Sequence, residues 1–145
     1  MSEENNKAIS RRFFEEVFSR GKLEVADELF ASNHRTLGPG ALPDLPNGPA
    51  GVKALVQFYR KAFPDTQFTI DEQIADGDRV VTRWTVKGTQ KGEMEGLGIP
   101  VTGKPVTISG VSVDHFMGGK IVDTWGLFDQ LGMMQQLGVV PGQNR

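Results

Sequence analysis

The chain has 145 residues, of which 38% are hydrophobic and 23% charged, so we expect one globular domain over residues 1–145. The formal net charge is -2 and no basic run occurs, which excludes the electrostatic signature of a nucleic-acid-binding protein. Cysteine is absent and the two histidines, His34 and His115, are isolated, so we expect no disulfide, no thiolate chemistry and no metal site.

The first part of the chain has the periodicity of helices. Apolar residues spaced by four over residues 3–19 predict an amphipathic helix that ends at Gly21. A shorter helix is expected over residues 23–30, and an irregular loop with three prolines and two glycines over residues 31–47. Gly48 and Pro49 then predict the start of a third helix, which Pro64 ends.

The rest of the chain alternates as strands do. Residues 67–74 and 79–90 predict a hairpin around an Asp-Gly turn, and residues 106–116 and 120–128 predict a second hairpin before a short final helix. This order predicts an α+β fold, in which three helices cover the concave face of a curved antiparallel sheet and leave a cavity between the layers. No segment has the apolar length of a signal peptide or membrane span, so we expect a cytoplasmic protein that does not contact a membrane.

Five segments carry a family resemblance. They are Gly119–Gly138, Arg11–Phe18, Val25–Ala31, Gly77–Thr89 and Gly98–Lys104. In this order they resemble the SnoaL-like polyketide (ester) cyclases of the nuclear-transport-factor-two-like superfamily. The resemblance implies a cone-shaped fold, a homo-oligomer (dimer or tetramer), no cofactor, and a mostly apolar cavity for a small carbonyl, ester or polyketide-like ligand.

The characterised cyclases of this family close a ring by an intramolecular aldol reaction. A carboxylate removes a proton from a carbon next to a carbonyl or ester, and the enolate attacks a second carbonyl held nearby. An apolar cavity raises the pKa of such a carboxylate and makes it a stronger base.

The sequence departs from the family at the positions that carry titratable groups. Gly126 stands where the cyclases have an acidic residue, and Ser112 stands at a histidine position of the preceding strand. Gln90 replaces another histidine, and an Asn-His pair of relatives falls on Thr36 and Leu37. The resemblance therefore predicts the fold and leaves the identity of the base open.

Three other residues are candidates for a catalytic role. Asp114 lies two residues after Ser112, so alternation places both on one strand face; it is either a relocated base or a solvated residue near the turn. Asp129 lies between the last strand and the last helix, where a helix N-cap is the favoured interpretation. His34 could bring an imidazole to the cavity, or it could pack at the end of the second helix.

Ten residues are predicted to contact a ligand. Six are aromatic and could line a pocket, although aromatic residues at such spacings first build a core. Arg83 could instead form an ion pair with Glu93, and His115 is expected on the outer face of the sheet. The ten are Phe14, Phe18, Tyr59, Arg83, Trp84, Gln90, Ser112, Trp125, Gly126 and Phe128.

Three functions remain open at this point. The first is a cyclase-like enzyme that uses Asp114 or another acid, and the second is a binding protein that kept the cavity without the chemistry. The third is another lyase, isomerase or epoxide hydrolase on the same fold. Epoxide opening would need a cluster of two aspartates and an arginine, which only Asp114, Arg83 and Asp129 could supply.

Overall fold

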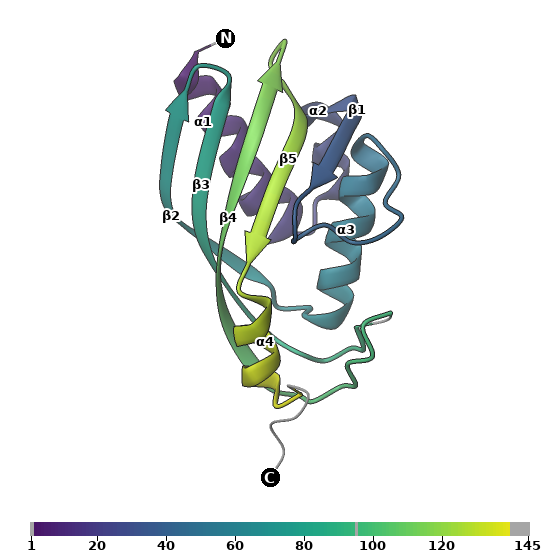
Figure 1. Ribbon diagram of the computed structural model, residues 1–145. Helices are drawn as coiled ribbons and strands as arrows, with labels where there is room; N and C mark the ends of the chain where they lie inside the picture. The colour runs from purple at the N-terminus through teal and green to yellow at the C-terminus, as the bar shows by residue number, and fades with distance from the viewer. Residues whose placement is uncertain (1, 95, 140–145) are drawn as a thin grey trace.

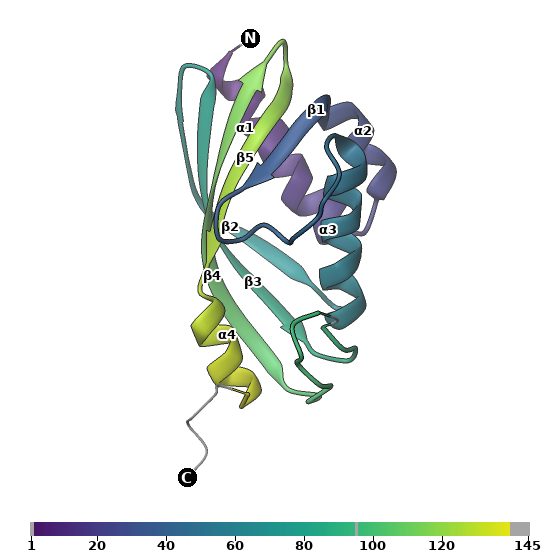
Figure 2. The same ribbon diagram turned by 45° about the vertical axis from the view of Figure 1, so that its right-hand side comes forward.

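The computed structural model describes residues 2–94 and 96–139. Its first three helices lie on one side of a curved, five-stranded sheet, as Figure 1 shows. Figure 2 gives a view closer to the edge of the sheet, with α1, α2 and α3 together on the same side of it. The predicted α+β class is confirmed.

The first helix changes its geometry halfway. α1 (Glu3–Arg12) begins at Ser2, whose side chain accepts a hydrogen bond from the backbone N–H of Asn5 at 3.0 Å. The chain then continues as a wider π-helical segment, Phe13–Phe18. Ring contacts within it, 5.0 Å between Phe13 and Phe14 and 5.8 Å between Phe13 and Phe18, show that these aromatic side chains pack together. The sequence predicted this helix without its change of pitch.

The second predicted helix is shorter than expected. A 3₁₀ turn (Leu23–Val25) leads into α2 (Ala26–Leu29), and Phe30 already belongs to a strand. The predicted loop over residues 31–47 is therefore wrong in its first part, because β1 (Phe30–Leu37) runs parallel to β5. Its sequence has few β-branched residues, and its pairing partner lies about ninety residues later, so no local pattern indicated the strand.

The third helix follows its prediction closely. α3 (Pro49–Ala62) has proline at its start and buries Val52 and Val56. Gly48, just before it, has φ +78°, and a Cβ there would lie 2.5 Å from the Ser32 carbonyl oxygen. Glycine is required at this position, where the chain turns from β1 into α3.

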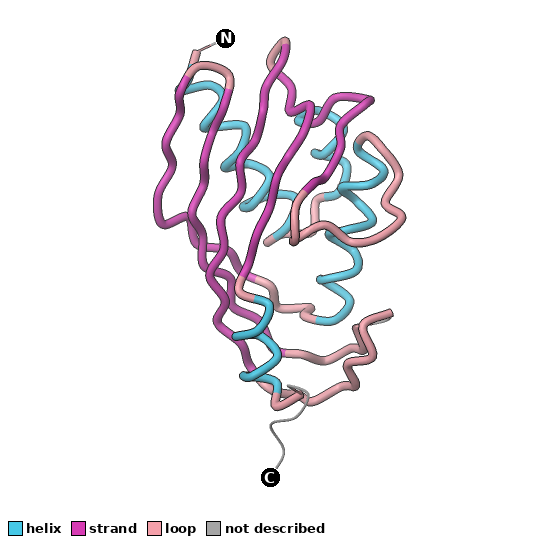
Figure 3. Tube along the Cα trace, viewed as in Figure 1, coloured by secondary structure: helices cyan, strands magenta, loops and turns pink. Residues whose placement is uncertain are grey.

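Four longer strands complete the sheet, which Figure 3 shows as the magenta trace. β2 (Gln67–Asp76), β3 (Arg79–Thr89), β4 (Pro105–Met117) and β5 (Lys120–Phe128) pair antiparallel in succession, giving the order β1-β5-β4-β3-β2. The sheet is thus antiparallel as predicted, except for the parallel pair at the β1 edge. α4 (Gln130–Leu137) follows β5 and packs against the first part of β4.

Two groups of buried side chains form the core. In the view of Figure 1, the larger group joins the helices α1, α2 and α3 to the upper half of the sheet. The smaller group joins α4 and the end of α3 to the lower half. Phe128 and Tyr59 pack against both groups. Within the described residues, no helix has the length and apolar character needed to cross a membrane.

Candidate functional site

A cavity of about 130 Å³ lies between the helices and the concave face of the sheet. Its wall is mainly apolar, with many aromatic side chains, and polar side chains from β1, β4 and β5 meet at one part of it. The aromatic residues are Phe13, Phe14, Phe18, Phe30, Tyr59, Phe63, Phe68, Trp84 and Phe128. The polar groups from these three strands are His34, Thr36, Ser112, Asp114 and Thr124.

Asp114 is the carboxylate of this cavity. It lies on β4 opposite Thr124 of β5, and only 3% of its surface is exposed. Its Oδ2 accepts a hydrogen bond from the Ser10 hydroxyl at 2.6 Å, and its Oδ1 accepts one from the Thr124 hydroxyl at 2.7 Å. Burial raises the pKa of Asp114 to about 6, although the two hydroxyl hydrogen bonds act in the opposite direction.

His34 lies in the same polar part of the cavity. Its Nε2 is 3.0 Å from the Thr124 hydroxyl oxygen, and its ring meets the ring of Phe30 edge to face at 4.7 Å. Burial lowers the pKa of His34 to about 4, so the imidazole is neutral at physiological pH. Thr124 thus connects the imidazole to the carboxylate.

A second polar pair in the cavity wall is neutral. The indole N–H of Trp84 donates to the Ser112 hydroxyl at 3.1 Å, which gives both buried side chains a polar partner. Burial raises the pKa of Tyr59 to about 12, so its phenol stays protonated. This leaves Asp114 as the group of the polar part that titrates near neutral pH.

Gly126 on β5 lies beside this polar part, opposite Ser112 on β4. A Cβ built at this glycine would meet no atom within 4 Å. The space beside Gly126 is therefore open, and the carboxylate of Asp114 lies on the neighbouring strand.

Four of the predicted residues lie away from the cavity. Asp129 caps α4, where its side chain accepts the Gly132 N–H at 2.9 Å. Trp125 faces outward and is 40% exposed, because alternation on β5 turns it away from Gly126. Gln90 is fully buried, but its side chain holds the following loop by hydrogen bonds to Pro100 and Thr102.

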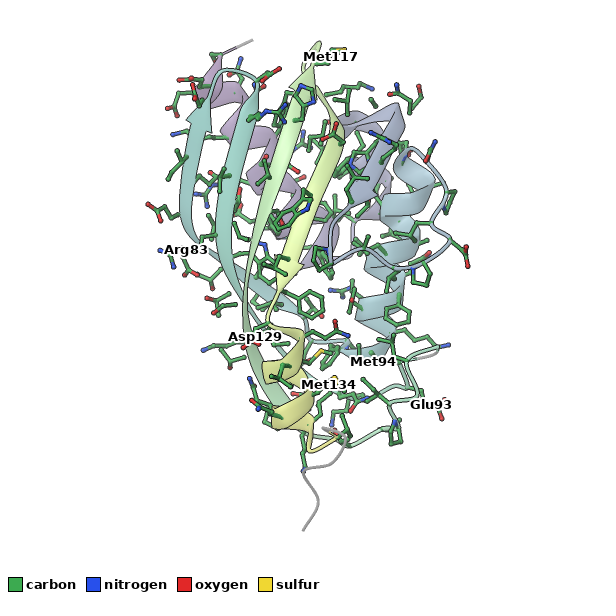
Figure 4. All side chains as sticks on the ribbon, viewed as in Figure 1. Arg83, Glu93, Met94, Met117, Asp129 and Met134 are labelled. Carbon is green, nitrogen blue, oxygen red and sulfur yellow. The ribbon has the colours of Figure 1, made fainter. Side chains whose placement is uncertain are left out.

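Arg83 is the fourth. It lies on the outer face of β3 and pairs with Glu72 at 3.3 Å. Figure 4 shows Arg83 and Glu93 on opposite sides of the molecule, so the predicted pair between them is wrong. Because Arg83 and Asp129 both lie apart from Asp114, the cluster that epoxide opening would require does not form.

The remaining histidine lies on the outer face, as predicted. His115 Nε2 is 2.9 Å from Asp78 and its Nδ1 is 3.3 Å from Asp123. Over residues 2–94 and 96–139, no group of three or more histidine, cysteine or acidic side chains has a geometry that could hold a metal ion.

Sequence reasoning missed two hydroxyls of the site. Thr124 shares its strand face with Gly126, so alternation on β5 could have indicated it. Ser10 belongs to a row of buried residues spaced by four on the first helix, Asn6, Ser10 and Phe14, whose polar members break the apolar pattern. A buried serine in an apolar row was the available signal.

Comparison with known proteins gives the family. The SnoaL-like polyketide cyclase model matches residues 8–137, so the chain belongs to this family. No curated protein sequence matches it.

Solved structures agree with this assignment. A proposed polyketide cyclase from Acidithiobacillus ferrooxidans is 37% identical, with 95% of this chain and 98% of that chain covered and a TM-score of 0.81. An NTF2-like protein of unknown function from Burkholderia pseudomallei is 25% identical over 94% and 98% of the two chains, with a TM-score of 0.73. TsrD from Streptomyces laurentii, at 24% identity, covers 97% and 99% with a TM-score of 0.86 and supports the fold alone.

Proposed function

We propose that this chain is a SnoaL-like enzyme that performs acid/base chemistry on a carbon acid, an apolar carbonyl or ester compound. The observation that carries the proposal is Asp114, a buried carboxylate in the wall of an aromatic cavity. The cavity walls would exclude water and hold the apolar part of the substrate. Asp114 would meet its acidic C–H.

The proposed step is proton removal by Asp114. With a pKa of about 6, the carboxylate is mostly ionised at pH 7, and it is a stronger base than a solvated aspartate. The enolate formed would attack a second carbonyl of the same substrate in an aldol-type cyclisation, and the protonated Asp114 would return its proton to the new alkoxide. One carboxylate is sufficient for both transfers.

A non-catalytic binding protein is the alternative. Gly126 favours it, because the acidic residue of the family is absent and leaves open space. In this alternative, the cavity binds an apolar ligand, and Asp114 only accepts a hydrogen bond from a polar group of that ligand.

An exchange assay separates the two. 2-Tetralone is a small aromatic ketone with acidic α-protons, and ¹H NMR in D₂O follows their replacement by deuterium. The wild-type protein is expected to accelerate this exchange, and Asp114→Asn to lose about 10²- to 10⁴-fold, the usual contribution of a general base. Asp129→Asn is the matched control, because asparagine keeps the helix cap outside the cavity.

Each result of this assay has a meaning. Full exchange activity in Asp114→Asn would remove Asp114 from the mechanism. Line broadening of the ketone signals by wild-type protein without faster exchange would favour the binding protein.

We also infer a homo-oligomer in the cytoplasm. Support for assembly comes from exposed apolar side chains on the outer face of β5 and on α4: Trp125, Leu127 and Leu131 are 40%, 41% and 58% exposed. Light scattering coupled to size exclusion would give the mass, and a monomer at micromolar concentration would contradict this inference.

A further inference from the structure

A chain of four side chains from four elements crosses the polar part of the cavity. It runs from Ser10 on α1 to Asp114 on β4, then to Thr124 on β5 and His34 on β1. Ser10 is fully buried and lies 104 residues from Asp114 in sequence.

The count of hydrogens fixes the direction of this chain. A carboxylate has no hydrogen to give, so the single hydrogens of Ser10 and Thr124 both go to Asp114. Thr124 then has only lone pairs left for its 3.0 Å contact with His34, which makes Nε2–H of the imidazole the donor. His34 therefore carries its hydrogen on Nε2 and cannot accept a proton there.

We propose that Ser10 and Thr124 are positioning residues for Asp114, and that Thr124 also sets the tautomer of His34. One hydroxyl holds each carboxylate oxygen, which fixes the carboxyl plane and leaves the remaining lone pairs for a substrate. The proposal deepens the function above and rests on Asp114 as the base.

The surroundings explain why two donors are needed. Asp114 faces His34 on β1 and Ser10 on α1, and its cross-strand neighbour on β3 is Val80. The charge of Asp123 on β5 raises the pKa of Asp114 further. Burial and Asp123 both favour the neutral acid, whereas each hydroxyl hydrogen bond stabilises the carboxylate. Without the donors, Asp114 would be protonated at neutral pH and could not act as a base.

Direct titration of Asp114 tests this without any substrate. Protein labelled with ¹³C at the aspartate carboxyl is titrated by NMR, and Asp114→Asn identifies the signal. Ser10→Ala and Thr124→Val are each expected to raise the midpoint by about 1 to 2 pH units, because hydrogen bonds to a charged group have this strength. Thr124→Ser keeps the hydroxyl and should restore the wild-type midpoint.

Thr82→Val is the matched control. Thr82 is fully buried on β3, and its hydroxyl accepts a hydrogen bond from Gln73 at 3.3 Å. Its variant loses a buried hydroxyl from the same sheet and should leave the midpoint of Asp114 unchanged. Serine at position 10 lies within a helix, where alanine is well tolerated, and Thr124→Val keeps the branched shape that a strand favours.

The spectrum of His34 gives an independent readout. In ¹⁵N NMR of the wild type, Nε2 should carry the hydrogen and Nδ1 should not. An Nδ1–H tautomer would overturn the assigned direction, and an unchanged Asp114 midpoint in both Ser10→Ala and Thr124→Val would overturn the positioning role.

The exchange assay with 2-tetralone separates failure of this inference from failure of the proposed function. If the midpoint of Asp114 moves as expected but wild-type protein exchanges no α-protons, the positioning role of Ser10 and Thr124 is supported and the proposed chemistry is refuted. If exchange depends on Asp114 but Ser10→Ala and Thr124→Val leave its pH profile unchanged, the proposed chemistry is supported and the positioning role is refuted.

Discussion

β4 and β5 carry acidic residues on both faces of the sheet, and the two faces treat them differently. On the inner face, Asp114 is 3% exposed and accepts hydrogen bonds from two neutral hydroxyls. On the outer face, the side chain of Asp123 on β5 is 28% exposed and pairs with His115. The same imidazole also contacts Asp78, which lies in the turn between β2 and β3 and has a side chain that is 61% exposed. Burial without a cation gives a carboxylate that is costly to ionise, whereas exposure beside an imidazole gives an ordinary surface pair.

The comparison teaches where reactivity comes from in this fold. Asp114 and His115 are adjacent in sequence, yet alternation sends one into the cavity and the other to solvent. The difference between a candidate base and a surface ion pair is therefore set by one step along a strand.

The largest effect is expected in the pH dependence of stability for Asp114→Asn. Folding raises the pKa of Asp114 from 3.8 to about 6. Because the pKa is raised, the contribution of Asp114 to the free energy of unfolding is fully present below pH 3.8 and is lost as the pH rises through about 6. The asparagine variant should therefore gain about 2 kcal/mol relative to wild type between about pH 4 and pH 7.

The measurement is urea denaturation of both proteins across this range. Direct comparison is essential, because His34 acts in the opposite direction: its pKa falls from 6.5 to about 4, so its contribution is lost as the pH falls. The contributions of Asp114 and His34 to stability therefore change in opposite directions with pH in the wild-type protein. Asp123→Asn, on the outer face, should show a much smaller gain, and an equal gain in the two variants would refute the contrast.

Sequence patterns were sufficient for most of the fold and for part of the site. Periodicity located α3 and the antiparallel strands, and alternation correctly placed Asp114 with Ser112 on one face. It could not locate β1, whose partner β5 is distant in sequence, and so could not show that His34 points at Thr124. The hydroxyl of Ser10 was missed for the same reason: its role exists only after helix and sheet have packed together.

Gly126→Asp sharpens the contrast by adding a second carboxylate to the inner face. The open space at this position should admit the side chain without a clash. A like charge near Asp114 disfavours ionisation of both groups, so the ¹³C midpoint of Asp114 should rise by about 1 pH unit. Trp125→Asp, at a position that is 40% exposed and outside the cavity lining, is the control and should produce a smaller rise. A midpoint that stays constant in Gly126→Asp would mean that the two positions do not share one cavity.

The smallest effect is expected from His115→Asn on the outer face. This change removes both ion pairs of the imidazole, at 2.9 and 3.3 Å, from partly exposed side chains. Pairs of this kind contribute roughly 0 to 1 kcal/mol each, because water solvates the separated groups almost as well. Urea denaturation at pH 6 should show a loss of about 1 kcal/mol or less, with the ¹³C midpoint of Asp114 close to that of wild type. A loss above about 3 kcal/mol would contradict this, because it would mean that the outer pairs hold the strands that position Asp114.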